Sequence, residues 1–239
     1  MLNPTIAAIT FRATVGRRRA LLFAIAPVIL IAITLVLKAG RPPGAVWPER
    51  VLGDIGFSVL LPLTALIIGT SVLGAEIDDG SVIHLLATPV RRRDVIVTKF
   101  AVASLLTMLF TAVPELIAGL IAPSGSKLAI GLFVGALAGS VIYSAVFVMA
   151  SAVTTRAIAV GLLYVLIWEA LLSNFVGGAR LLSVGHYALG IANGIAPNTA
   201  LNAGLSVTTS VIMGVIVTAA ALILATRRLS SFGVTGDAA

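Results

Sequence analysis

The chain has 239 residues, of which 59% are apolar and only 10% are charged. A soluble domain carries about 25% charged residues, so this composition indicates an integral membrane protein. The absence of cysteine excludes disulfides and cysteine-ligated metals, and with only two histidines we expect no metal site. The formal charge of +7 is explained by arginines that flank membrane spans, so we expect no nucleic-acid partner.

The first 19 residues are predicted to form a separate element. Asn3 can cap a helix with Pro4 at its first position, and Arg17, Arg18 and Arg19 supply charge at its end. This pattern predicts an interfacial helix within residues 1–19 that lies along the membrane surface. The alternative is a frayed tail that carries basic residues.

Six segments are apolar enough to cross a bilayer, for which a helix needs about 20 residues. They are residues 20–37, 51–74, 95–122, 129–153, 157–172 and 205–226. We therefore expect an all-α integral membrane protein with six transmembrane helices. A single transmembrane domain would cover residues 1–239.

The distribution of lysine and arginine predicts the orientation of these spans. With the N-terminus inside, eleven of the 16 basic residues lie on the inner side and five on the outer side. The positive-inside rule then places both termini in the cytoplasm, including the tail at 227–239. The loop at 75–94 falls on the same side.

Residues 75–94 combine charge with a short apolar pattern. Asp79 or Ser81 can cap a cytoplasmic helix, and Pro89 discourages its continuation. Its apolar face would hold Val82, Ile83, Leu85 and Leu86. We expect Arg91, Arg92 and Arg93 to meet anionic lipid headgroups as the chain re-enters the membrane, and Lys99 to lie at the same membrane interface. The alternative is an ordinary charged loop with an apolar tether.

Three glycines at four-residue spacing, Gly131, Gly135 and Gly139, mark one face of the fourth predicted span. Small residues let helices approach closely, which favours packing within one subunit over a subunit interface. Residues 173–204 are too apolar for a free loop. Short helices that re-enter the outer leaflet would explain this segment, provided that protein covers their backbone.

Besides Asp54 at the outer end of the second span, two acidic residues lie within predicted spans. Glu115 is expected near the outer interface, whereas Glu169 is flanked by apolar residues in the fifth span. A carboxylate in the membrane predicts a functional site, for instance on a transport pathway, unless the helix ends early and Glu169 reaches the surface. An ion-coupled carrier is therefore one alternative function. An intramembrane protease is weaker, because His186 and His84 fall in different segments and no G-x-S-G occurs.

No nucleotide-binding G-x-x-x-x-G-K-[ST] motif occurs in the chain, so any use of ATP must come from a partner. The ordered residues of the 75–94 loop resemble a signature of type-2 ABC transporter permeases, the membrane subunits of bacterial drug, lipid-linked and polysaccharide exporters. The match consists of Glu76-x-Asp78-x-Gly80-Ser81, Leu85-Leu86, Thr88-Pro89-Val90, Arg92 and Lys99. Arg91 departs from it, since the family often has serine there.

This resemblance implies a transport subunit without catalytic residues of its own. The 79–87 helix would be the coupling helix, which docks in a cleft on a cytosolic ATPase subunit. Two such subunits per transporter would bind ATP and magnesium. Its apolar residues would anchor it, and Glu76, Asp78 and Asp79 would supply polar contacts. A second permease subunit, alternating access, a bacterial plasma-membrane location and a pathway near Glu169 are also implied. With 6% aromatic residues, we expect an exported drug or antibiotic rather than a polysaccharide.

Overall fold

A computed structural model describes residues 4–40, 47–78, 91–175, 177–197, 201 and 204–231 of the chain. Every regular element in these ranges is helical, and none of the described residues forms a strand. This agrees with the all-α class expected from the composition.

Five helices are long and apolar enough to cross a membrane, among the described residues. They cover Phe23–Gly40, Trp47–Gly74, Arg92–Ile121, Ser126–Val153 and Val207–Leu229. The remaining expected span, 157–172, corresponds to a shorter apolar helix, Ala157–Leu172. The chain is therefore a helical membrane protein, with five long spans where six were expected.

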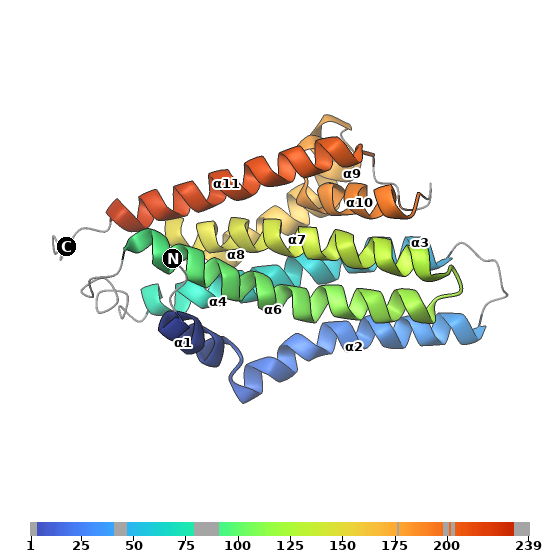
Figure 1. Ribbon diagram of the computed structural model, residues 1–239, viewed down its shortest axis with the longest axis horizontal. Coiled ribbons are helices and arrows are strands. Elements are labelled where there is room, and N and C mark those ends of the chain that lie inside the picture. Colours follow the sequence, from blue (N-terminus) through green and yellow to red (C-terminus); the bar gives the residue numbers. More distant parts are fainter. Residues whose placement is uncertain are drawn as a thin grey trace.

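The long helices lie side by side along the longest axis of the molecule (Figure 1). They are α2 (Arg17–Gly40), α4 (Leu61–Asp78), α6 (Arg92–Ile121), α7 (Ser126–Val153) and α11 (Val207–Ser231). Helix α7 lies in the middle and packs against α4, α6 and α11. Its aromatic residues Tyr143 and Phe147 are fully buried and stacked, with ring centroids 5.8 Å apart. The largest apolar core therefore surrounds α7.

The N-terminal helix α1 (Pro4–Thr14) is shorter than the 1–19 element expected from the sequence. It ends before Gly16, and the three arginines form the first turn of α2 instead of the end of α1. The structure describes only the backbone of these arginines, Arg17, Arg18 and Arg19, and not their side chains. Asn3, the expected cap, also lies outside the described residues.

The second span contains an irregular stretch. A short helix α3 (Trp47–Val51) leads into a π-helix, η1 (Leu52–Leu60), and then into α4. The N–H of Leu61 donates to the carbonyl of Gly56, five residues earlier. Pro62 follows and has no N–H to donate, so the regular ladder is interrupted at this point.

The fifth span also changes helix type. Helix α8 (Ala157–Leu163) continues into a second π-helix, η2 (Tyr164–Leu172), and then into α9 (Ser173–Phe175). A 3-10 helix, η3 (Gly177–Leu182), and helix α10 (Val184–Ile195) follow. Short helices were expected between 173 and 204, and α10 packs against α7 and α11. Most of the first nine residues of α10 are buried, so protein covers its backbone.

Candidate functional site

The predicted coupling segment connects the ends of α4 and α6. Its central residues, 79–90, lie outside the described residues, as do the side chains of Glu76 and Asp78. This applies to Asp79, Gly80, Ser81, Val82, Ile83, Leu85, Leu86 and Pro89. The structure does describe the two helices that carry the segment, and these helices define its base.

Lys99 joins the two helices at this base. Its side chain is fully buried, and Nζ donates to the carbonyl oxygen of Val72 on α4 at 2.5 Å. The sequence predicts Lys99 at the membrane interface, and the structure adds that its side chain is enclosed between the helices. The basic run just before Lys99 gave no sign of this contact, because only the fold brings a backbone acceptor of α4 beside it.

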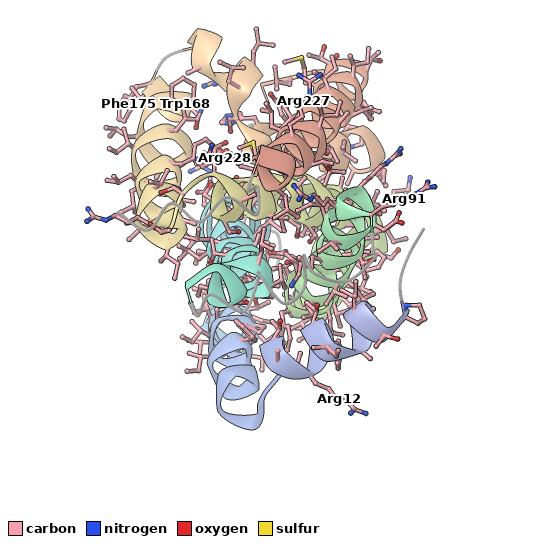
Figure 2. All side chains as sticks on the ribbon, turned by 90° about the vertical axis from the view of Figure 1, so that its left-hand side faces the viewer. Arg12, Arg91, Trp168, Phe175, Arg227 and Arg228 are labelled. Carbon is pink, nitrogen blue, oxygen red and sulfur yellow. The ribbon has the colours of Figure 1, made fainter. Side chains whose placement is uncertain are left out.

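A second contact ties the same base to the end of α11. Arg92 donates from Nη1 to the carbonyl of Leu229 at 3.0 Å, so α6 contacts both α4 and α11 here. Arg91 and Arg93 are exposed, as residues at a membrane interface would be. Figure 2 views this end of the molecule and shows Arg91 beside α6, with Arg12, Arg227 and Arg228 at the same end.

The second cluster lies at the opposite end of the bundle, around Glu169 of η2. Its carboxylate accepts hydrogen bonds from several donors among the described residues, including the Tyr164 hydroxyl at 2.8 Å, the Ser183 hydroxyl at 2.5 Å, and the N–H groups of Val184 at 2.9 Å and Gly185 at 3.4 Å. The last two belong to the first turn of α10, where backbone N–H groups have no hydrogen-bond acceptor within the helix itself. Glu169 therefore fastens the start of α10 to η2.

Ser183 and His186 complete this helix start. Ser183 accepts from the N–H of His186 at 3.2 Å, and its hydroxyl lies 3.0 Å from Nδ1 of the same histidine. Burial, followed by the charge of Arg180, lowers the pKa of His186 to about 4. A small polar cavity of about 30 Å³ lies beside Glu169 and His186 and is also lined by Asp54. This is enough room for a water molecule.

The Ser183–His186 distance alone would suit a nucleophile and its base. However, the Ser183 hydroxyl is fully buried and donates its proton to Glu169, not to the histidine. The arrangement is that of a helix cap, and it gives no support to a protease.

Glu115 of α6 is buried in a different environment. Its side chain is 1% exposed, and neither carboxylate oxygen has a hydrogen-bond partner among the described residues. The carboxyl lies against Gly56 of η1: a Cβ added to that glycine would be 1.6 Å from Oε1. Glu115 and Glu169 thus lie in separate places. The sequence indicated both acids, but it did not indicate the glycine beside Glu115 or the hydrogen-bond donors around Glu169.

The three glycines of α7 face α10. A Cβ at Gly131 would lie 2.8 Å from the carbonyl oxygen of Ala192, and one at Gly135 would lie 2.6 Å from that of Ala188. At Gly139 the added atom would be 2.5 Å from Leu61 Cδ2 and 3.0 Å from Ala188 Cβ. The glycines allow close packing within one chain, which is the alternative that the sequence favoured.

The long apolar helices and the buried polar contacts between them define a multi-span helical membrane protein. A family model described as ABC-2 family transporter protein matches residues 16–168, well over half of the chain. The chain therefore belongs to the ABC-2 transporter family. No curated protein sequence matches it. Family membership implies the permease of an ABC exporter, a membrane-embedded transport subunit rather than an enzyme, which works with ABC ATPase subunits.

Proposed function

We propose that the chain is the permease of a bacterial exporter that moves a hydrophobic small molecule, such as a drug or antibiotic, out of the cell. Separate ATPase subunits drive alternating access, and they, not this chain, bind ATP and magnesium. The observation that carries this proposal is the family match over residues 16–168, which spans the loop with the permease signature.

The 79–87 segment is the proposed coupling helix. Its support from the structure comes from its base, where Lys99 bonds to Val72 and Arg92 bonds to Leu229. These contacts join α4, α6 and α11 close to the segment. A force applied by an ATPase would then reach three helices at once.

The coupling segment and both chain ends face the cytoplasm of a bacterial cell in this proposal. The arrangement supports it, because helix α1 and the end of α11 lie at the same end of the bundle as the end of α4 and the start of α6, between which the segment falls in the sequence (Figure 1). Arg12, Arg91, Arg227 and Arg228 are also at that end (Figure 2). Basic residues concentrate on the cytoplasmic side of membrane proteins.

A second permease subunit, identical or homologous, would complete the transporter together with two ATPase subunits. Helices α8 and η2 support this, because they expose large aliphatic side chains along the short apolar helix. The exposed residues are Ile158, Val160, Leu162, Leu163, Leu166, Ile167 and Leu171. A second subunit or lipid would cover this face in a membrane.

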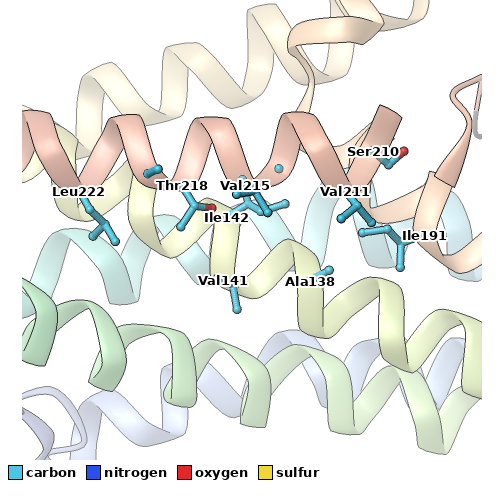
Figure 3. A pocket seen from close by; sticks show the side chains of 11 residues that line it. Ala138, Val141, Ile142, Ile191, Ser210, Val211, Val215, Thr218 and Leu222 are labelled. Atoms are coloured by element: carbon cyan, nitrogen blue, oxygen red, sulfur yellow. The ribbon is translucent and has the colours of Figure 1, made fainter. Parts of the chain in front are cut away.

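A hydrophobic cargo is supported by an apolar groove on the side of the bundle (Figure 3). The groove has a volume of about 510 Å³ and lies between α7, α10 and α11. Its lining includes Val211, Val215 and Leu222 of α11 and Val141 and Ile142 of α7. Ser210 and Thr218 are the hydroxyl-bearing residues in its lining. Such a surface favours a largely apolar molecule over a sugar chain.

The coupling role is tested in the chain coexpressed with its ATPase subunit. Leu85→Asp and Leu86→Asp place a charge on the predicted apolar face, so we expect loss of ATP-driven transport and of copurified ATPase. His84→Asp is the matched control, because His84 falls on the opposite side of the predicted helix. Equal transport and copurification in all three variants would refute docking through this face.

A further inference from the structure

Glu115 has no part in the proposed coupling to an ATPase, and its surroundings are unusual for an acid. It lies directly after Pro114 in α6, is 1% exposed, and has no hydrogen-bond partner for either carboxylate oxygen in the described part of the chain. Glu169 provides an internal comparison, because it is similarly buried but receives several hydrogen bonds. The lack of donors is therefore particular to the place where Glu115 lies.

The place is formed by the contact between η1 and α6. A Cβ on Gly56 would lie 1.6 Å from Oε1 and 2.6 Å from Cδ of Glu115, so the carboxyl lies against a bare glycine backbone. About one turn before and after Gly56 on η1, and before and after Glu115 on α6, lie buried aliphatic residues of one core cluster: Leu52, Leu60, Ala112 and Ala118. The surroundings consist mainly of hydrocarbon.

No basic side chain compensates Glu115 among the described residues. On η1, Asp54 lines the cavity beside Glu169, and α4 has no titratable residue between Leu61 and Gly74. On α2 and α7, Lys38 and Lys127 are exposed, and Tyr143 lies beside Gly185 and Glu169. The arginines of α1 and α11 are at the far end of the bundle: Arg12, Arg227 and Arg228.

An ionised carboxylate without donors or a cation is costly in such surroundings, and the neutral acid is the favoured form. We propose that Glu115 is a proton-binding site that is occupied while η1 lies against α6. If this contact opens to water, the carboxyl ionises and the proton leaves. Proton binding then stabilises the closed η1–α6 contact, which becomes sensitive to pH. This site is independent of the proposed cargo and of the ATPase subunits.

The test uses the full chain in phosphatidylcholine vesicles and infrared spectroscopy, which separates the C=O stretch of a protonated carboxyl from ionised carboxylates. At neutral pH we expect one protonated carboxyl that is lost in Glu115→Gln and retained in Asp54→Asn. Gly56→Ala keeps every acid but displaces the carboxyl, so its band should disappear at a lower pH than in the wild type. Identical spectra of the wild type and Glu115→Gln would overturn the proposal, as would an unshifted titration in Gly56→Ala.

A second measurement covers the case in which Glu115→Gln does not fold. Glu115→Leu fills the same apolar space without a titratable group. If the folded wild type holds one extra proton, its unfolding equilibrium constant should rise by up to about tenfold per pH unit relative to Glu115→Leu, above about pH 4.3. A ratio that stays constant with pH would show that no proton is held.

Discussion

Glu169→Leu tests whether this membrane acid holds α10 in place or serves transport directly. The substitution removes the acceptor of two buried backbone N–H groups, those of Val184 and Gly185. The Ser183 hydroxyl can turn to His186 Nδ1, only 3.0 Å away, and Tyr164 is partly exposed to solvent or lipid. The uncompensated loss is therefore mainly that of the two N–H groups.

An unsatisfied buried donor costs roughly 1–3 kcal/mol, so two give about 2–6 kcal/mol. Entry of a water molecule into the adjoining cavity, about 30 Å³ in volume, would bring the cost to the lower part of this range. Taking about 3 kcal/mol, and roughly 2–4 °C per kcal/mol for a chain of this size, the melting temperature should fall by about 6–12 °C.

The assay is thermal unfolding of the purified chain, with Asp54→Asn as the control because Asp54 lines the same cavity but is exposed. Transport is measured in parallel. A melting temperature of Glu169→Leu equal to that of Asp54→Asn would refute the structural role. Glu169→Gln with normal stability but abolished transport would instead favour an ion-coupled carrier.

Two further predictions concern α10 and its neighbours. Gly135→Ala places a methyl group 2.6 Å from the carbonyl oxygen of Ala188, so overpacking should lower the free energy of unfolding by about 1–3 kcal/mol in thermal or denaturant unfolding. Gly178→Ala, with nothing within 4 Å, is its control, and equal losses would contradict the packing argument. Burial, and then Arg180, lower the pKa of His186 to about 4 from an ordinary 6.5, so the folded chain binds fewer protons than the unfolded chain between these values. The free energy of unfolding should therefore decline as the pH falls from 6.5 toward 4, and His186→Asn should reduce this decline. If the free energy of unfolding of the wild type and of His186→Asn fell in parallel over this range, a buried neutral histidine would be contradicted.

The spans were largely readable from the sequence, because a long apolar run has few structures available to it in a membrane. Helix ends were less accurate. Arg17 begins α2, whereas the prediction started that span at residue 20, because basic side chains can extend from the first turn of a spanning helix to the interface. The short helices between 173 and 204 were expected because the segment is too apolar to remain a free loop.

The polar contacts could not be predicted. Glu169 was found from its depth, but its partners Ser183, Val184 and Gly185 are about 15 positions away and meet it only through the turn after η2. Lys99 follows three arginines in a pattern typical of a membrane surface, yet the fold supplies a carbonyl of α4 that buries it. Glu115 was expected near the outer interface, and sequence alone gave no indication that Gly56 would cover it. The spacing of Gly131, Gly135 and Gly139 indicated that another helix packs closely against this face, but it did not indicate that this helix is α10.

The position of the Lys99–Val72 bond along its two helices has a mechanical consequence. Lys99 lies seven residues into α6 and Val72 six residues before the end of α4, which at 1.5 Å per residue places the bond about 10 Å from the mouth of the 79–90 segment. The ends of α4 and α6 between this bond and the segment are therefore short compared with the rest of α6. If α6 turns about Lys99 when the segment is displaced sideways, the far end of α6 moves by more than the segment does, because 22 residues of the helix follow Lys99.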